Sequence, residues 1–251
     1  MVRFICKTIF VGVLFSVLSY GTANALPKIT AKAWLVADDN GKMIEGINTK
    51  DVRSIASISK LMTAMVILDA KLPLDEVLTL RKQSITRLEV LQLAVTHSDN
   101  EAALLLCETY PKGYHACIHD MNSKADQLGM MNTNFIEPTG LSVFNVSTAE
   151  ELVKLVTAAS KYPEIVQASN SPIVKIKVSN KKKTFLQEFR NTNPLVATKN
   201  FIVSKTGFIS KSGGCIVMMI DANNKEKIVV LLGSKNTHTR IPEAKMIALA
   251  Y

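Results

Sequence analysis

Residues 56–69 read "ASISKLMTAMVILD", a stretch in which Ser57 stands three residues before Lys60 and an almost entirely apolar run follows. Lysine is rarely fully buried without a partner, so Lys60 needs a chemical reason to stand there. Residues three apart share one face of a helix, which sets the Ser57 hydroxyl beside the Lys60 amine, whereas Ser59 points about 100° away. The stretch therefore predicts a buried helix that begins with a paired serine and lysine.

This pair suggests nucleophilic catalysis. A serine hydroxyl becomes an effective nucleophile when a base takes its proton, and a neutral lysine amine can act as that base. Neutrality near pH 7 requires the lysine pKa to fall by roughly 3 units, which corresponds to about 4 kcal/mol. Burial disfavours the charged form, and a nearby second cation adds to the effect. We therefore interpret Ser57 as a nucleophile and Lys60 as its base, with a second cation expected from elsewhere in the chain.

Two further motifs follow in order, Ser98-Asp99-Asn100 and Lys205-Thr206-Gly207. Ser-x-x-Lys alone is a weak signal, since about one match arises by chance in a chain this long, and Ser179–Lys182 is a second match in a polar turn. The Ser98 motif could instead be a capping box completed by Glu101, and the Lys205 motif could simply end a strand. All three motifs in this order form the set associated with penicillin-recognising serine enzymes.

The Lys205 motif is expected to bind substrate. Lys205 offers a cation to a terminal carboxylate and is expected to help depress the pKa of Lys60. Thr206 offers a hydroxyl to the same carboxylate, and Gly207 lets a ligand backbone lie against the strand edge. The backbone N–H of Phe208 is one expected donor of an oxyanion hole.

The remaining residues complete the expected chemistry. The backbone N–H of Ser57 is the second oxyanion donor, and such a donor is typically worth ~3–4 kcal/mol. Ser98 could relay a proton to the leaving amine. Asn100 can hold both Lys60 and a substrate amide.

The rest of the chain predicts an α/β (α+β) fold. Residues 33–37 and 43–47 read as a hairpin around Asn40-Gly41, a strong turn signal. Helical patterns dominate up to Pro163, and a capping box at Ser147–Glu150 is expected to open one helix. Strands are then expected at 174–178, 184–189, 201–207, 214–220 and 227–233, before a last helix over 241–251. We expect an antiparallel sheet from both chain ends, flanked by helices, with a mainly helical subdomain inserted at roughly 72–165.

Residues 1–25 have the features of a secretory signal: a basic start, an apolar run of 14 residues and the ending Ala23-Asn24-Ala25. The run is too short to span a bilayer, so we expect cleavage after Ala25, export, and no stable transmembrane anchor in the mature domain of residues 26–251. The chain as a whole has a net charge of +9. This charge is consistent with an anionic cell-wall or lipid partner or simply with solubility, and no nucleic acid is expected.

Three cysteines remain after the signal: Cys107, Cys117 and Cys215. An odd count cannot form a complete disulfide framework. Cys107 and Cys117 could pair in an oxidising compartment, but we expect buried free thiols, because free cysteine behaves as a small apolar residue.

The sequence resembles the D-alanyl-D-alanine peptidases of the low-molecular-mass penicillin-binding protein family, from about Ala31 to Gly233. The residues that carry the resemblance are "RSIASISKLMTAMVILD", "SDNEAA", "EPTGLSVFNVSTAEEL", "FRNTNPLV" and "SKTGF…GGCIVM". Within the family, the sequence is most similar to the penicillin-sensitive D,D-endopeptidases. The resemblance implies a D,D-peptidase/serine β-lactamase-like fold and acylation of Ser57 by peptidoglycan peptides in the periplasm. It also implies β-lactams as covalent inhibitors, and no metal or organic cofactor.

One departure from the family leaves two alternatives open. The segment between Ser57 and Ser98 is shorter than expected, so one wall of the substrate groove is predicted to be missing. A catalytically impaired peptidoglycan-binding pseudoenzyme would fit that loss, since fold need not mean function. A class A-like β-lactamase would need a glutamate on a loop after Ser98. Glu137 stands in such a place, but Gly140 and Leu141 differ from the lactamase pattern.

Overall fold

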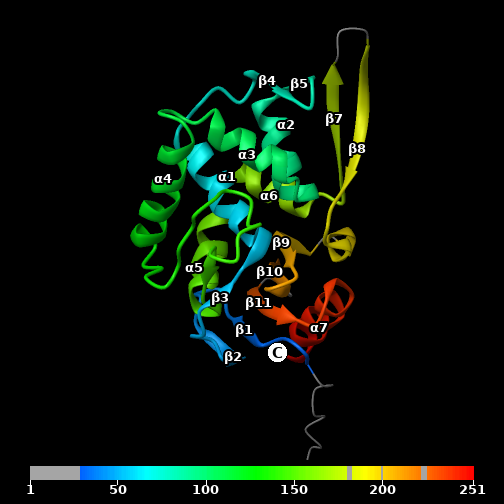
Figure 1. Cartoon of the computed structure of the whole chain (residues 1–251). Coiled ribbons are helices and arrows are strands. Elements are labelled where there is room, and N and C mark those ends of the chain that lie inside the picture. The colour runs from blue at the N-terminus through cyan, green and yellow to red at the C-terminus, as the bar shows by residue number, and fades with distance from the viewer. Residues whose placement is uncertain (1–28, 180–182, 199, 222–224) are drawn as a thin grey trace, which may run out of the picture.

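Both ends of the described chain build one five-stranded antiparallel sheet (Figure 1). The computed structural model describes residues 29–179, 183–198, 200–221 and 225–251, so the expected signal at 1–25 lies outside the described residues. The strand order is β2-β1-β11-β10-β9. The strands are β1 (Ala33–Ala37), β2 (Met43–Ile47), β9 (Phe201–Ile209), β10 (Gly213–Asp221) and β11 (Glu226–Ser234). The predicted sheet is confirmed, and β9 lies at its edge.

Helices cover both faces of this sheet. Helix α5 (Ala149–Ala159) packs on β1, β10 and β11, while α7 (Thr237–Ala250) packs on β10 and β11. Trp34 of β1 belongs to the cluster around α7, whereas Leu35 belongs to the larger core that includes α5. Alternate side chains of a strand point to opposite faces. A strand buried on both faces therefore reads as a continuous apolar run, as β1 does.

Helix α1 (Ser59–Asp69) lies at the centre of the helical layer and packs against its neighbours on several sides. Residues from Ser59 to Ile67 are all buried, as the apolar run predicts. The other helices of the layer are α2 (Arg87–Gln92), α3 (Asn100–Glu108), α4 (Tyr114–Gln127) and α6 (Pro163–Asn170). Short helical turns are η1 (Ala56–Ile58), η2 (Leu93–His97) and η3 (Pro194–Thr198).

The predicted capping boxes are wrong by one residue. Thr148, not Ser147, caps α5 by accepting a hydrogen bond from Glu151 N. Asp99, not Ser98, caps α3 by accepting one from Ala102 N. The last helix begins earlier than expected, because the side chain of Asn236 caps its first turn.

A second antiparallel sheet has the order β4-β5-β7-β8 and lies beside the helical layer (Figure 1). The expected strands at 174–178 and 184–189 belong to this sheet and not to the central one. Its strands are β4 (Val77–Leu80), β5 (Gln83–Thr86), β7 (Ile173–Ser179) and β8 (Thr184–Arg190). A third, two-stranded sheet pairs β3 (Arg53–Ser54) with β6 (Val146–Ser147).

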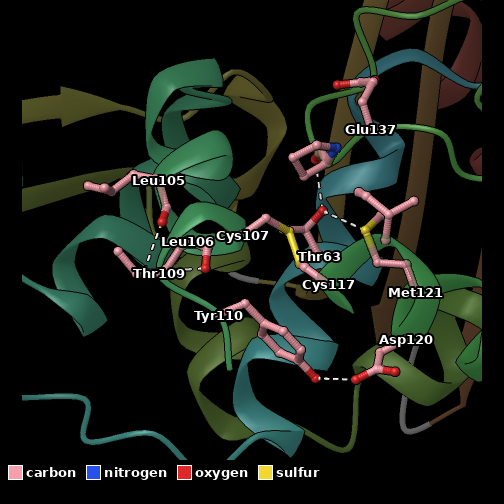
Figure 2. The surroundings of a disulfide bond; sticks show 12 residues. Thr63, Leu105, Leu106, Cys107, Thr109, Tyr110, Cys117, Asp120, Met121 and Glu137 are labelled. Atoms are coloured by element: carbon pink, nitrogen blue, oxygen red, sulfur yellow. Dashed lines mark hydrogen bonds between the residues drawn. A yellow bond between two sulfur atoms is a disulfide. The ribbon is translucent and has the colours of Figure 1, made fainter. Parts of the chain in front are cut away.

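Cys107 and Cys117 form a disulfide that joins α3 to α4 (Figure 2). The prediction of free thiols is therefore wrong for this pair, whereas Cys215 is a buried free cysteine as expected. The turn between the two helices brings the Cα atoms of the pair to 5.4 Å, a separation that a disulfide can bridge. Spacing along the sequence could not reveal that approach.

Candidate active site

The Nζ atom of Lys60 lies at the centre of the site. It donates to Ser57 Oγ at 2.9 Å, to Asn100 Oδ1 at 2.7 Å and to the carbonyl oxygen of Thr139 at 2.6 Å. Ser57 lies on η1 and Asn100 begins α3, so two of the three predicted motifs meet at this amine. Lys60 itself is fully buried. An ammonium group has three donors, and these three acceptors use all of them.

Burial lowers the pKa of Lys60 from 10.5 to about 7, although the negative charges of Glu137 and Asp99 act in the opposite direction. A lysine with this pKa is partly neutral near pH 7 and can accept a proton. We expected Lys205 to help depress the pKa of Lys60, but burial alone accounts for the lowered pKa of Lys60. The repulsion between the two lysines instead lowers the pKa of Lys205, for which burial is the larger cause.

Strand β9 runs directly beside the serine. A Cβ atom on Gly207 would lie 2.8 Å from Ser57 N and 3.0 Å from Ile55 O. Real Cβ contacts are essentially never under 3.0 Å, so the close packing of β9 on η1 requires glycine here. The sequence suggested a different reason for this glycine, the approach of a ligand backbone.

The other residues of the β9 motif lie along the same strand. Lys205 is 1% exposed, and its Nζ atom donates to Thr206 O at 3.0 Å. The hydroxyl of Thr206 donates to Thr192 Oγ1 at 2.6 Å. The next residue, Phe208, has a half-exposed side chain. These side chains therefore border the site from the edge of the central sheet.

The Ser98 motif follows a π-helical turn, η2, of the kind often found at functional sites. Ser98 adopts a left-handed conformation with φ of 61° and is half-buried. Asp99 then caps α3, and Asn100 reaches Lys60. Arg81, a residue that sequence reasoning missed, binds both carboxylate oxygens of Asp99 at 2.9 and 2.7 Å.

The loop 137–145 supplies the third acceptor of Lys60. The Glu137 carboxylate accepts hydrogen bonds from the backbone N–H groups of Thr139, Gly140 and Ser142, and from the Thr139 hydroxyl. Asn145 ties the loop to α1 by donating to Ser59 Oγ at 2.9 Å. Glu137 thus shapes the loop that presents the Thr139 carbonyl. A lactamase would need this carboxylate directed at water.

Arg240 is another residue that sequence reasoning missed. It lies on α7, and its Nη1 atom donates to Gly207 O at 2.7 Å. Its burial lowers the pKa of its guanidinium, and its charge contributes to the lowered pKa of Lys205. A single arginine in a C-terminal helix carries no sequence signal, because its role depends on α7 packing on β10 and β11, from where Arg240 reaches Gly207 of β9.

Within the described ranges, no group of three or more histidine, cysteine and carboxylate side chains could hold a metal ion. No helix in the described part of the chain is long and apolar enough to cross a membrane.

A half-buried serine hydrogen-bonded to a buried lysine at the head of a central helix, next to an edge strand with Lys-Thr-Gly, defines the class of penicillin-recognising serine enzymes. A sequence model of the D-alanyl-D-alanine carboxypeptidase family matches residues 20–82 and 74–236. The chain therefore belongs to that family and is a serine-type D-alanyl-D-alanine peptidase, a hydrolase.

Individual relatives support the same family assignment. The chain is 42% identical to a D-alanyl-D-alanine endopeptidase of Escherichia coli over 90% of this chain and 78% of that protein. It is 41% identical to a D-alanyl-D-alanine endopeptidase of Pseudomonas aeruginosa over 84% of this chain and 73% of that protein. The Streptomyces K15 DD-transpeptidase has the same fold, with a TM-score of 0.84 at 24% identity over 90% and 98% of the two chains. Penicillin-binding protein D2 from Listeria monocytogenes, solved in a cefotaxime-bound form, has a TM-score of 0.79 at 26% identity over 89% and 98%.

Proposed function

We propose that this protein cleaves the D-alanyl bond of peptidoglycan peptides through an acyl-enzyme on Ser57. The observation that supports this proposal is the arrangement of hydrogen bonds around Lys60 Nζ. Asn100 Oδ1 and the Thr139 carbonyl are acceptors without a hydrogen, so a neutral Lys60 keeps two N–H bonds directed at them. Its lone pair then faces the Ser57 hydroxyl at 2.9 Å. In this arrangement Lys60 is a positioned general base.

Acylation then proceeds in two steps. Ser57 Oγ attacks the carbonyl carbon of the D-alanine residue while its proton passes to Lys60 Nζ. The backbone N–H groups of Ser57 and Phe208 stabilise the resulting oxyanion. As the C–N bond breaks, Ser98 passes a proton from Lys60 to the leaving amine. Ser57 is left as an ester, which water hydrolyses to a carboxylate and the free hydroxyl.

The β9 motif binds the leaving-amine side of the substrate. Lys205 and Thr206 bind a carboxylate, and the arrival of that negative charge favours the protonated form of Lys205. Asn100 holds Lys60 and contacts the substrate amide. Each of these roles is tested by substitution at the named residue, with Ser57→Ala as the reference for complete loss of acylation.

We propose endopeptidase action on cross-links as the main activity, in cell-wall remodelling. This preference is supported by the two relatives named endopeptidases, which are 42% and 41% identical to the chain. β-Lactams are the expected covalent inhibitors. Digestion of purified muropeptides, resolved by mass, tests the preference. Loss of cross-linked dimers supports it, and release of free D-alanine from monomers would make the protein a carboxypeptidase instead.

Labelling with a fluorescent penicillin tests the acyl-enzyme itself. A covalent band that Ser57→Ala abolishes supports the proposal. No band with the folded wild-type protein would favour the non-catalytic wall-binding alternative. Rapid turnover of a chromogenic cephalosporin would favour the β-lactamase alternative, because a D,D-peptidase is expected to remain as a stable acyl-enzyme.

We also propose that residues 1–25 direct export to the periplasm and are cleaved after Ala25, which leaves a catalytic domain of residues 26–251. The apolar run of 14 residues and the Ala-x-Ala ending support this. The intact mass of the protein recovered from the periplasm tests the cleavage position. Recovery of the full-length chain from the membrane fraction would contradict it.

A further inference from the structure

The short segment between the Ser57 and Ser98 motifs contains the β4–β5 hairpin. Leu80 pairs with Gln83, so Arg81 and Lys82 form a two-residue turn. Both turn residues have positive φ, at 52° and 65°, as in the type I′ turns that suit the twist of a hairpin. Asparagine and glycine usually occupy such positions, so the arginine and the lysine are unusual there.

The turn places Arg81 against the Ser98 motif. Arg81 Nη2 donates to Asp99 Oδ2 at 2.7 Å and to Oδ1 at 2.9 Å, and Nε donates to Glu101 Oε2 at 2.9 Å. The side chain of Asp99 is 6% exposed, and its Oδ1 also accepts from Ala102 N. The Asp99 carboxylate is thus fixed by Arg81 on one side and by Ala102 N on the other. Because Asp99 lies between Ser98 and Asn100 in the chain, these contacts hold the backbone that carries both residues.

The hairpin that carries Arg81 is itself anchored. Leu78, Leu80 and Ile85 are buried in the core. Just after the hairpin, Glu89 of α2 accepts a hydrogen bond at 3.0 Å from the backbone N–H of Lys177 on β7. The position of Arg81 is therefore set by the second sheet and does not depend on the salt bridge alone.

The ion pair between Arg81 and Asp99 affects the protonation of Lys60, because Asp99 is one of the charged groups around that amine. Asp99 faces Lys60 from the start of α3, Glu137 faces it from the loop 137–145, and Lys205 lies near it on β9. The negative charge of Asp99 opposes the neutral form of Lys60. Arg81 is the cation bound to that carboxylate, so it compensates the charge that would otherwise favour a protonated Lys60.

We propose that Arg81 is a positioning residue that acts through Asp99. It holds the turn that carries Ser98 and Asn100, and it compensates the Asp99 charge beside the amine of Lys60. The hairpin thereby supplies the support for the Ser98 motif in a chain whose segment before that motif is short. This inference rests on the proposed function, because it concerns the same acylation step.

Arg81→Met and Lys82→Met form a matched pair that tests the proposal. Each removes one positive charge from the same turn, but only Arg81 has an ion pair with Asp99 among the described residues. The rate of acylation by a fluorescent penicillin is measured from pH 5.5 to 9 at constant ionic strength. We expect Arg81→Met to slow acylation at pH 7 by about tenfold or more, as small misplacements of catalytic groups do. We also expect the midpoint of its acid limb to rise by about half a pH unit or more.

A second substitution separates charge from position. Asp99→Asn keeps a side-chain oxygen that can accept the hydrogen bond from Ala102 N, but it removes the negative charge. In the Arg81→Met background it should therefore return the midpoint of the acid limb toward that of the wild type. Lys82→Met should keep the wild-type midpoint.

Two results would overturn the proposal. One is an Arg81→Met profile identical to that of Lys82→Met. The other is an equal reduction of the acylation rate at every pH, with the midpoint of the acid limb unchanged. That result would mean a merely structural role for Arg81. Absence of labelling in the wild-type protein would refute the proposed function instead, so the two failures are distinguishable.

Discussion

Lys60 Nζ lies 2.9 Å from Ser57 Oγ, while the two other acceptors of this amine, Asn100 Oδ1 and the Thr139 carbonyl, carry no hydrogen. Of the three contacts, the one with Ser57 alone can reverse its direction. Loss of a proton from Lys60 therefore converts this hydrogen bond into one that Ser57 donates. The geometry links the protonation state of one buried amine directly to the nucleophilicity of one hydroxyl.

The first prediction concerns pH. The pKa of Lys60 is lowered to about 7 by burial, and the reactive form is the neutral one. Acylation by penicillin should therefore be slow at pH 5.5, rise through a midpoint near pH 7 and level off above pH 8. Stopped-time labelling across this range, with far-ultraviolet circular dichroism at each pH as a control for folding, measures the midpoint. A rate independent of pH between 6 and 8 would contradict the role of Lys60.

The second prediction concerns Glu137. Its charge raises the pKa of Lys60, so Glu137→Gln should move the midpoint of the acid limb to lower pH, in the opposite direction to Arg81→Met. The loss of one carboxylate acceptor should also loosen the loop 137–145 and lower the plateau rate. The same pH series measures both effects. A midpoint that stays in place would show that this charge does not reach Lys60.

Glu137→Gln also addresses the lactamase alternative. If Glu137 activated the water for deacylation, the variant would accumulate acyl-enzyme that the wild-type protein turns over. We expect the lifetime of the penicilloyl adduct to be within about threefold of the wild-type value, since a change of less than 1 kcal/mol corresponds to that range. Release of the label over hours, followed by mass spectrometry, measures it.

The third prediction concerns Gly140. It has a φ of +79°, and an added Cβ atom would overlap the carbonyl group of Ala56, immediately before Ser57. Gly140→Ala should displace either η1 or the loop and reduce acylation by about 100-fold, as displacements near 1 Å do. Gly113→Ala is the matched control, because Gly113 has a φ of +84° but no heavy atom within 4 Å of the added Cβ. Equal activity of the two variants would contradict the proposed contact.

The fourth prediction concerns the disulfide. Cys107 and Cys117 are separated by 10 residues, and their bond joins α3 to α4 (Figure 2). Replacing both by alanine should lower the free energy of unfolding by about 2–3 kcal/mol through the greater freedom of the unfolded chain. Urea unfolding measures the change, with the wild-type protein under reducing conditions as a second form of the same test. Unchanged stability in both would mean that the helices hold each other without the bond.

The sequence alone predicted the parts of this protein that depend on local pattern. The apolar run after Lys60 indicated a buried helix, the strands at both chain ends with helices between them indicated a sheet covered by helices, and the Asn40-Gly41 turn indicated the first hairpin. The spacing of Ser57 and Lys60 placed hydroxyl and amine side by side, because helical geometry needs no information from elsewhere in the chain.

The tertiary structure decided what surrounds that pair. Lys60 and its acceptor Thr139 are far apart in the sequence, as are Arg81 and Asp99, and Arg240 and Gly207. No periodicity records such contacts, since each depends on how separate elements pack. The pairing of Cys107 with Cys117 was missed for the same reason. The approach of distant segments to one another is a property of the packed molecule, so these contacts could be found only in three dimensions.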